Sequence, residues 1–279
     1  MSKKYSRVYV EITNICNRSC SFCPGTKRPL TRLSTDRFAL ICDKLVEVTD
    51  YVYLHIMGEP LTHPDLRELI AIASQRHLKV AITTNGTLLS KASELLLSSS
   101  VYKVNVSLHS FEEGSDEQYI SYIKGCLDFA DRASLAGILV TLRLWNKGYD
   151  NGRNIDTLEL IREKFPGDWV FGPRGARIRH RLHLEEGDRF EWPDISLPEG
   201  DSRVFCHGLG DHFGILSDGT VVPCCLDRDG VMALGNIFEE SIQDILSSRR
   251  AREIADGFRK KNAPEPLCRR CGYARRFKI

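Results

Sequence analysis

Cys16-Asn17-Arg18-Ser19-Cys20-Ser21-Phe22-Cys23 places three cysteines in a CxxxCxxC spacing, directly after an extended apolar run at residues 8–12. Iron–sulfur clusters are normally held by four cysteine thiolates, so a loop that supplies three leaves one iron without a protein ligand. An open coordination position is where a metal centre does chemistry. The alternatives are a structural zinc site and a disulfide with one thiol left over. The next cysteine, Cys42, lies in an apolar helical pattern that is typical of a buried residue, so we favour the cluster-binding loop.

The loop, with the aromatic Phe22 just before its last cysteine, resembles the signature loop of the radical S-adenosylmethionine (SAM) enzymes. The resemblance implies a catalytic [4Fe–4S] cluster on Cys16, Cys20 and Cys23, with its open iron chelated by the amino and carboxylate groups of SAM. It also implies that the reduced cluster cleaves SAM to a 5′-deoxyadenosyl radical, which abstracts a hydrogen atom from the substrate. Phe22 is expected beside the cofactor, and an electron donor such as flavodoxin or ferredoxin is implied.

The composition excludes several classes of protein. The 279 residues are 42% apolar and 27% charged, as in ordinary soluble domains, and the net charge of +2 gives no reason to expect nucleic-acid or membrane binding. There is no signal-peptide pattern and no apolar run of the roughly 20 residues that span a membrane. Ten cysteines in a reducing compartment are better explained as metal ligands or buried thiols than as disulfides. We therefore expect a cytoplasmic protein.

Runs rich in β-forming residues alternate with helical patterns along the first 172 residues. Strands are expected at 8–12, 51–56, 79–83, 103–108, 138–144 and 169–171, and helices at 36–48 (capped by Ser34 or Asp36), 64–76, 88–97, 117–135 and 154–164. Such β-then-α units predict a parallel sheet covered by helices, and six strands are too few for an eight-stranded barrel. The resemblance implies an α/β fold with a partial (β/α)6 radical SAM barrel at 1–172. Residues 173–200 are predicted to be a linker that faces the substrate, and 201–279 a small cluster-binding domain.

The second strand leads into Gly58-Glu59-Pro60. This stretch resembles the "GGE" motif of the family, with Met57 in place of its first glycine. In relatives this backbone edge receives the SAM amino group, so Gly58 and Glu59 are predicted to bind the cofactor. The alternative is a Gly-Pro turn that merely ends a strand.

Polar residues at the ends of later strands are predicted to contact SAM or substrate, because barrel-type sites form at the carboxyl ends of strands. Arg143 is the expected partner of the SAM carboxylate, since a guanidinium binds carboxylates bidentately. Ser107 could hydrogen-bond the same carboxylate or the ribose, and a purely structural hydrogen bond is the alternative for both. Further candidates are Thr84 and Asn85 for the cofactor and His55, His109 and Trp145 for the substrate, with a satisfied core histidine as the alternative for His55.

A second cysteine group follows in the C-terminal part: Cys206, Cys224, Cys225, Cys268 and Cys271. A hairpin signal at Asp218-Gly219 separates the first two, and a helix is expected over 239–257. The pattern resembles a truncated SPASM or twitch extension of radical SAM enzymes and implies a second [4Fe–4S] cluster on Cys206, Cys224, Cys268 and Cys271. Cys225 is left out because neighbours on a strand point to opposite faces. An all-thiolate zinc site stays an alternative.

Between the two parts lies an arginine-rich stretch. If it is extended, Arg177, Arg179 and Arg181 share one face. Such a ridge could grip a phosphate, a carboxylate or an acidic peptide, so Arg177 is a candidate substrate contact. The alternative is a solvated edge strand protected by its charge.

The sequence therefore predicts a radical SAM enzyme, an oxidoreductase or lyase, that acts on a small-molecule or peptide substrate. A lyase of a modified nucleoside or nucleobase conjugate is the alternative within this class. From another class, the chain could be a non-catalytic zinc-binding or nucleic-acid-binding module that uses the arginine ridge. That module would hold zinc rather than iron and would not cleave SAM.

Overall fold

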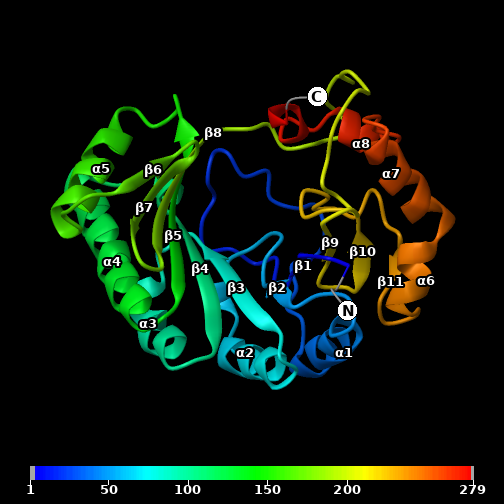
Figure 1. Ribbon diagram of the computed structural model, residues 1–279, viewed down its shortest axis with the longest axis horizontal. Coiled ribbons are helices and arrows are strands. Elements are labelled where there is room, and N and C mark those ends of the chain that lie inside the picture. Colours follow the sequence, from blue (N-terminus) through cyan, green and yellow to red (C-terminus); the bar gives the residue numbers. More distant parts are fainter. Residues whose placement is uncertain (1–3, 278–279) are drawn as a thin grey trace.

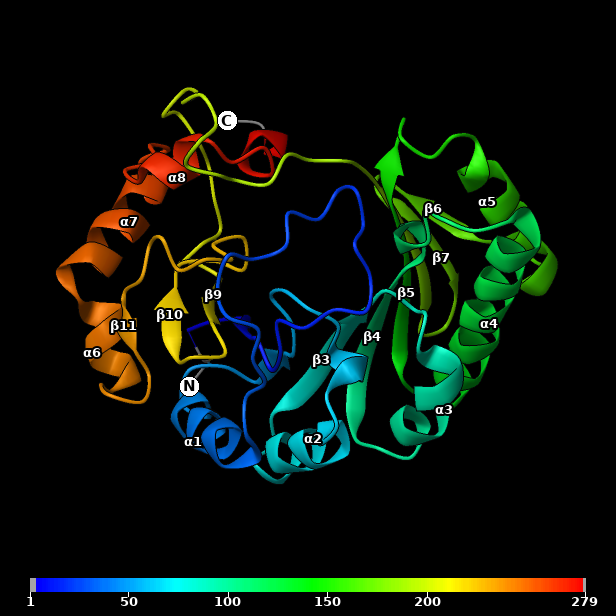
Figure 2. The same cartoon turned by 180° about the vertical axis from the view of Figure 1, so that it is seen from behind.

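The structure is a computed structural model that describes residues 4–277, in which one curved sheet carries helices on its outer side (Figure 1 and Figure 2). The strands are β1 (Arg7–Val10), β2 (Tyr51–Tyr53), β3 (Lys79–Thr84), β4 (Val101–Ser107), β5 (Leu139–Lys147), β6 (Val170–Gly172), β7 (Gly175–Arg179), β8 (Leu182–Asp188), β9 (His212–Ile215), β10 (Thr220–Val222) and β11 (Gly235–Asn236). The helices are α1 (Thr35–Leu45), α2 (Leu66–Gln75), α3 (Leu89–Leu97), α4 (Asp116–Leu135), α5 (Arg153–Lys164), α6 (Ile242–Ser247), α7 (Arg249–Arg259) and α8 (Pro266–Arg269). Short 3₁₀ turns lie at Pro60–Thr62, Leu108–Ser110 and Ala274–Arg276.

The first five strands form the predicted parallel core. β1 to β5 are neighbours in chain order, and each pairs in parallel with the next. In β1 the burial alternates, with Val8 and Val10 fully buried while Arg7 and Tyr9 are half-buried on the other face. Ser34 caps α1 by accepting a hydrogen bond from the Arg37 amide at 3.3 Å. Of the two predicted caps, Ser34 and Asp36, the structure therefore uses Ser34.

A strand forms close to the predicted residues 169–171, but it is not the sixth parallel strand of the barrel. Residues 169–171 overlap β6, which lies at the outer edge of the sheet and pairs antiparallel with β7. The sixth parallel strand is β8, which pairs with β5 from Val140↔Leu182 onward. Two strands of the predicted linker at 173–200 therefore belong to the sheet, while the proposed division into domains stays a prediction.

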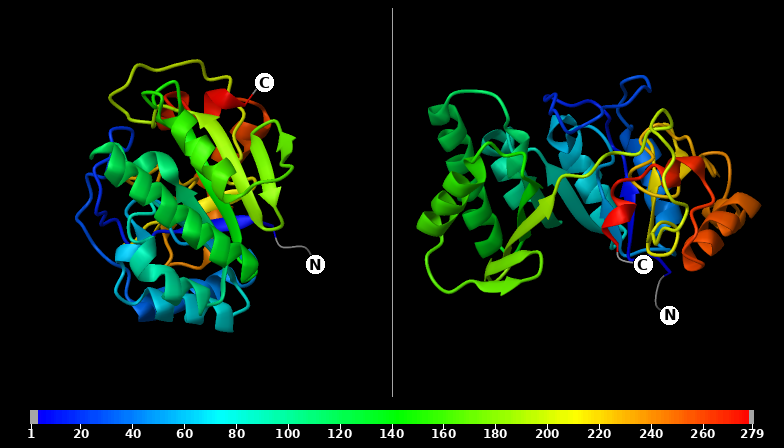
Figure 3. Two further views of the ribbon diagram at one scale, coloured as in Figure 1. Left: turned by 90° about the vertical axis from the view of Figure 1, so that its left-hand side faces the viewer. Right: turned by 90° about the horizontal axis from the view of Figure 1, so that it is seen from above.

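The C-terminal module continues the same sheet. The β9–β10 hairpin forms around the predicted turn, and β9 pairs in parallel with β1 over the register Arg7↔His212 to Val10↔Ile215. Figure 3 shows this module at the opposite end of the sheet from α4 and α5. The single helix expected over 239–257 is wrong: it is two helices, because Ser248 leaves the helical conformation at ψ 157° and caps α7 through the Ala251 amide.

A buried ion pair joins the module to the barrel. The Glu11 side chain is fully buried after β1, and both of its oxygens accept from Arg28 Nη2, at 2.6 and 2.7 Å. Glu11 also accepts hydrogen bonds from the Ser217 hydroxyl at 2.9 Å and from the Met57 amide at 3.2 Å. The carboxylate thus connects β1, the segment that follows the cysteine loop, the end of β2 and the C-terminal hairpin. None of the helices between residues 4 and 277 is long and apolar enough to cross a membrane.

Candidate functional site

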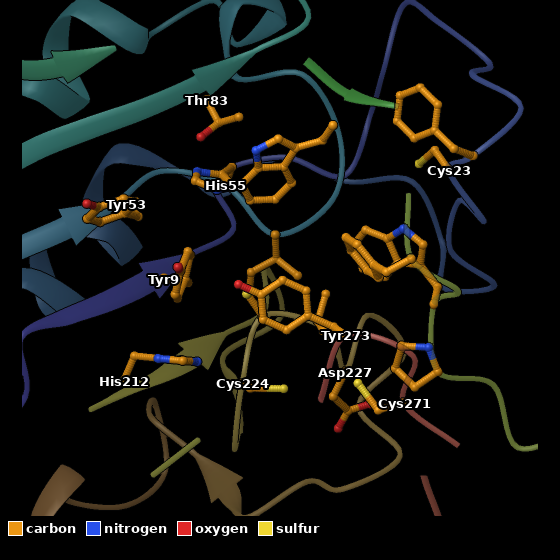
Figure 4. A pocket seen from close by; sticks show the side chains of 18 of the residues that line it. Tyr9, Cys23, Tyr53, His55, Thr83, His212, Cys224, Asp227, Cys271 and Tyr273 are labelled. Carbon is orange, nitrogen blue, oxygen red and sulfur yellow. The ribbon is translucent and has the colours of Figure 1, made fainter. Parts of the chain in front are cut away.

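A cavity of about 350 Å³ opens at the carboxyl ends of β2 to β5, where the barrel faces the C-terminal module. Figure 4 shows Cys23 on one side of it, Cys224 and Cys271 on another, and Tyr9 and His55 from the sheet. The predicted site residues that line the cavity are Cys16, Cys20, Phe22, Cys23, His55, Gly58, Glu59, Thr84, Asn85, Ser107, His109, Arg143, Trp145, Cys206, Cys224, Cys268 and Cys271. The structure therefore brings both cysteine groups and the strand-end residues to one space. The role of each residue stays a prediction.

The three cysteines of the first group, Cys16, Cys20 and Cys23, line this cavity. Burial, and then the nearby Glu112 carboxylate, raises the pKa of Cys20 to about 11, and burial also raises the pKa of Cys16. Iron binds the thiolate rather than the thiol, so bound iron would reverse these shifts. Soft thiolate donors without a fourth cysteine in the loop fit a [4Fe–4S] cluster with one open iron.

Contacts on both sides fix the tip of this loop. The Ser21 amide and hydroxyl each donate to the Glu112 carboxylate at 2.5 Å, and Arg189 donates to the Ser21 carbonyl at 3.0 Å. Phe22 packs on His109 with the ring centroids 5.0 Å apart. The cysteine loop is thereby held by residues that follow β4 and by the segment that follows β8.

Gly58 and Glu59 shape the turn after β2. Gly58 has φ +77°, and a Cβ there would come within 2.5 Å of the Thr13 carbonyl, so only glycine fits without a shift of the backbone. Glu59 accepts hydrogen bonds from the Asn85 amide at 2.7 Å and from the Leu61 amide at 3.0 Å. Burial raises the pKa of Glu59 to about 7 despite these hydrogen bonds. The Glu59 side chain therefore ties the end of β2 to the end of β3, and the backbone edge at Gly58 is left to face the cavity.

Arg143 lies on the inner face of β5. Its Nε donates to Glu185 of β8 at 3.1 Å, and its guanidinium stacks 4.7 Å from the Trp145 ring. His109 contacts the Arg143 carbonyl at 3.1 Å, and burial lowers the pKa of His109 to about 4, so the ring is neutral at pH 7. The arrangement leaves the Nη groups of Arg143 as its donors for an anionic group such as a carboxylate.

The cysteines of the second group, which are far apart in the sequence, all line the cavity on the side of the C-terminal module. Burial first, and then the nearby thiols of Cys206, Cys225, Cys268 and Cys271, raises the pKa of the Cys224 thiol, so these five cysteines lie near one another. Cys225 lies near this group too, and its thiol also contacts the Tyr9 hydroxyl. In the described residues no group of three or more His, Cys, Asp or Glu side chains is already arranged to hold a single metal ion. A cluster takes one thiolate per iron, so a set of four converging thiols fits it.

Sequence reasoning missed several lining residues. Arg7, Tyr9, Tyr53 and His212 all line the cavity from the inner face of the sheet. The period-two alternation of Arg7 and Tyr9 with the buried Val8 and Val10 carried the signal for that face. Tyr273 also lines the cavity from an irregular segment, where no periodic pattern marks a face, whereas Phe190 and Trp192 lie where the sequence suggested they could line the mouth of the barrel.

Arg177 does not line the cavity, contrary to the prediction. It is exposed on β7 and pairs with His183 across the strands. Arg179 instead binds Asp131 of α4 at 2.6 Å, and Arg181 adopts φ 59° in the turn before β8. The predicted arginine ridge does not form, because the strand ends before its third member.

Two family models match the chain. The model of the radical SAM superfamily matches residues 10–175, which include the first cysteine loop. The model of the SPASM iron–sulfur cluster-binding domain matches residues 206–272, which contain the second cysteine group. The alternative of a zinc site therefore finds no support in the comparisons.

Known proteins resemble the chain over most of its length. The antilisterial bacteriocin subtilosin biosynthesis protein AlbA of Bacillus subtilis (strain 168) is 28% identical, over 85% of this chain and 58% of AlbA. This chain thus spans only about half the length of that curated relative. BtrN, solved in complex with AdoMet and 2-DOIA, has a TM-score of 0.63 at 18% identity, and the match covers 97% of this chain and 94% of BtrN. SuiB of Streptococcus suis, bound to precursor peptide SuiA, has a TM-score of 0.56 at 17% identity, and the match covers 96% of this chain and 70% of SuiB.

Proposed function

We propose, because this chain belongs to the radical SAM superfamily, that it cleaves SAM reductively and removes a hydrogen atom from a small-molecule or peptide substrate. The observation that supports this most is the shared cavity, which both cysteine groups line together with the strand-end residues. When bound, the reduced cluster supplies the electron that cleaves SAM, and the radical so formed takes the hydrogen atom.

The residues of this chain bind and orient the reactants. Cys16, Cys20 and Cys23 would hold the catalytic cluster, and the backbone at Gly58 would receive the SAM amino group. Arg143 would bind the SAM carboxylate through its Nη groups, since its Nε is already used by Glu185.

The C-terminal module would hold a second [4Fe–4S] cluster on Cys206, Cys224, Cys268 and Cys271. The four cysteines line the same cavity as the first group, which supports a role in accepting an electron from the substrate or in anchoring the fold. An electron donor of the ferredoxin or flavodoxin type would reduce the clusters. Both substrate classes are kept because BtrN was solved in complex with 2-DOIA and SuiB was solved with a precursor peptide.

Anaerobic reconstitution tests this proposal. We expect about eight irons and about eight sulfides per chain, as two [4Fe–4S] clusters require. After reduction with dithionite, incubation with SAM should release 5′-deoxyadenosine, measured by liquid chromatography. A chain that takes up zinc in place of iron and leaves SAM intact would overturn the proposal.

The two adjacent cysteines should differ in their effect on iron content. Cys224→Ser is expected to lower the iron content by about four per chain, because it removes a ligand of the second cluster. Cys225→Ser should keep about eight irons, since its thiol turns toward Tyr9 instead. Iron and sulfide counts on the two reconstituted variants measure the difference, and equal losses would contradict the assignment of Cys224 as the ligand.

A further inference from the structure

A cation at the rim of the cavity has no role in the proposed function. This cation is Arg276, in the 3₁₀ turn near the C-terminus. Its guanidinium lies 5.8 Å from the ring centroid of Trp145, 5.9 Å from that of Phe190 and 5.3 Å from that of Tyr273. All three rings line the cavity, and they come from three separate segments of the chain. The cavity wall therefore holds the guanidinium beside the cavity through its aromatic rings.

The Arg276 guanidinium lies over the inner face of β8. A Cβ on Gly187 would come within 2.9 Å of its Nη2 atom and within 3.3 Å of Trp145, so the missing side chain leaves room for both. Gly187 is two residues beyond Glu185, which binds Arg143 inside the barrel, and alternate residues of a strand share a face. Arg276 is thus exposed to solvent but lies on the barrel side of the sheet.

Two hydrogen-bond donors at this place have no partner in the protein. Among residues 4–277, neither the Arg276 guanidinium nor the Tyr273 hydroxyl makes a hydrogen bond, and Arg276 has no ion pair. Burial raises the pKa of Tyr273, so its hydroxyl keeps its proton at pH 7 and can donate it to an acceptor. Figure 4 shows the Tyr273 side chain pointing into the cavity. Both donors are therefore available to a ligand that accepts hydrogen bonds.

The charges at the end of β8 leave Arg276 without a counterion. Glu185 is already paired with Arg143 at 3.1 Å. Glu186 and Asp188 alternate with the inward residues of the strand and are exposed on its outer face. In the proposed function, the remaining donors of Arg143 bind the SAM carboxylate. Arg276 then stays free for a second anion, and that anion would come with the substrate.

We propose that the Arg276 guanidinium and the Tyr273 hydroxyl form an anion subsite, and that the substrate carries a carboxylate or a phosphate group that binds there. The assignment rests on the proposed function, because that function places SAM at Arg143 and a substrate in the same cavity. A planar guanidinium can donate two parallel hydrogen bonds to either anion. The subsite thus recognises the chemistry that the two groups share, and the test below separates them.

Three fluorinated rings of similar size test the subsite: 4-fluorobenzoate as the carboxylate, 4-fluorophenyl phosphate as the phosphate and 4-fluorobenzamide as the uncharged control. Each is titrated into the reconstituted chain, with fluorine NMR as the readout. The clusters are kept oxidised and SAM is saturating, so that SAM stays intact and occupies Arg143. We expect at least one anion to bind about fivefold or more tightly than the amide. The anion with the larger preference identifies the group as a carboxylate or a phosphate.

Variants of the two donors should weaken the anions selectively. Arg276→Ala is expected to weaken the preferred anion about tenfold, or about 1.4 kcal/mol, and to leave the amide within about twofold. Arg276→Lys keeps the charge but not the planar pair of donors, so its loss should be smaller. Tyr273→Phe keeps the ring and should weaken the anion about threefold, as expected for one lost hydrogen bond. A purely structural role of either residue would change the anions and the amide alike.

Arg275→Ala is the matched control. Arg275 belongs to the same turn and carries the same charge, but its guanidinium lies against Gly200 instead. This variant should keep the preference for the anion. Equal binding of all three probes, no binding of either anion, an unchanged preference in Arg276→Ala, or an equal loss in Arg275→Ala would overturn the assignment. Release of 5′-deoxyadenosine by the same preparations after reduction tells a failure of this subsite from a failure of the proposed function.

Discussion

Replacing Glu11 with alanine is expected to lower the free energy of unfolding by about 3–5 kcal/mol, as does breaking other buried ion pairs by removing one partner. The substitution leaves Arg28, whose side chain is only 11% exposed, without its carboxylate. It also leaves the Ser217 hydroxyl and the Met57 amide without their acceptor. Because the same carboxylate joins the segment after the cysteine loop to the C-terminal hairpin, the loss should loosen both together. Urea unfolding followed by circular dichroism measures the change.

An exposed ion pair supplies the matched control. Glu94 binds Arg132 at 2.5 Å, but its side chain is 80% exposed. Glu94→Ala should therefore cost less than about 1 kcal/mol, as surface ion pairs usually do. Glu11→Gln keeps the volume and part of the hydrogen bonding, so its cost should lie between the two. Equal costs for Glu11→Ala and Glu94→Ala would show that the buried pair does not stabilise the fold.

The sequence was sufficient for the features that depend on local spacing. The cysteine loop and the polar residues at the strand ends could be predicted, because ligand spacing is local and parallel strands direct their carboxyl ends to one edge. These site residues therefore line one cavity, while Arg177 does not. Arg177 lies within β7, as an extended stretch predicts, but β7 lies beyond β8 toward the edge of the sheet, and Arg177 is exposed there. Whether each residue binds SAM or substrate is a matter of chemistry that the fold alone does not decide.

Features that depend on distant pairing could not be predicted. β8 carries acidic residues at Glu185, Glu186 and Asp188, so it has the composition of a surface loop, although Glu185 faces Arg143 inside the barrel. The apolar stretch 169–171 was the better strand by composition and became an edge strand instead. The pairing of β9 with β1 joins segments far apart along the chain, and no local pattern specifies it. Tertiary packing decides which strands carry polar residues on their inner face and which distant strands pair. Local sequence propensity carries no information about that packing.

Replacing Cys16 with alanine should abolish the release of 5′-deoxyadenosine, with a loss of at least about a hundredfold. Changes to groups that merely hold a metal ligand already cost about 10- to 100-fold, so loss of a ligand itself should cost more. Cys16 also accepts a contact from Asn85 Nδ2 at 3.9 Å, which places it beside the end of β3. The iron content should fall by about four per chain, while the second cluster is retained.

Cys42→Ala is the matched control for this loss. Cys42 is fully buried in α1 and is not among the residues that line the cavity, so it tests the removal of a thiol without the removal of a ligand. Its substitution should lower the free energy of unfolding modestly but keep about eight irons and the release of 5′-deoxyadenosine. If Cys16→Ala kept both its iron and its cleavage of SAM, the catalytic cluster would have to lie elsewhere. If Cys42→Ala lost both, the effect of Cys16→Ala would reflect the folding of the chain rather than the chemistry of the loop.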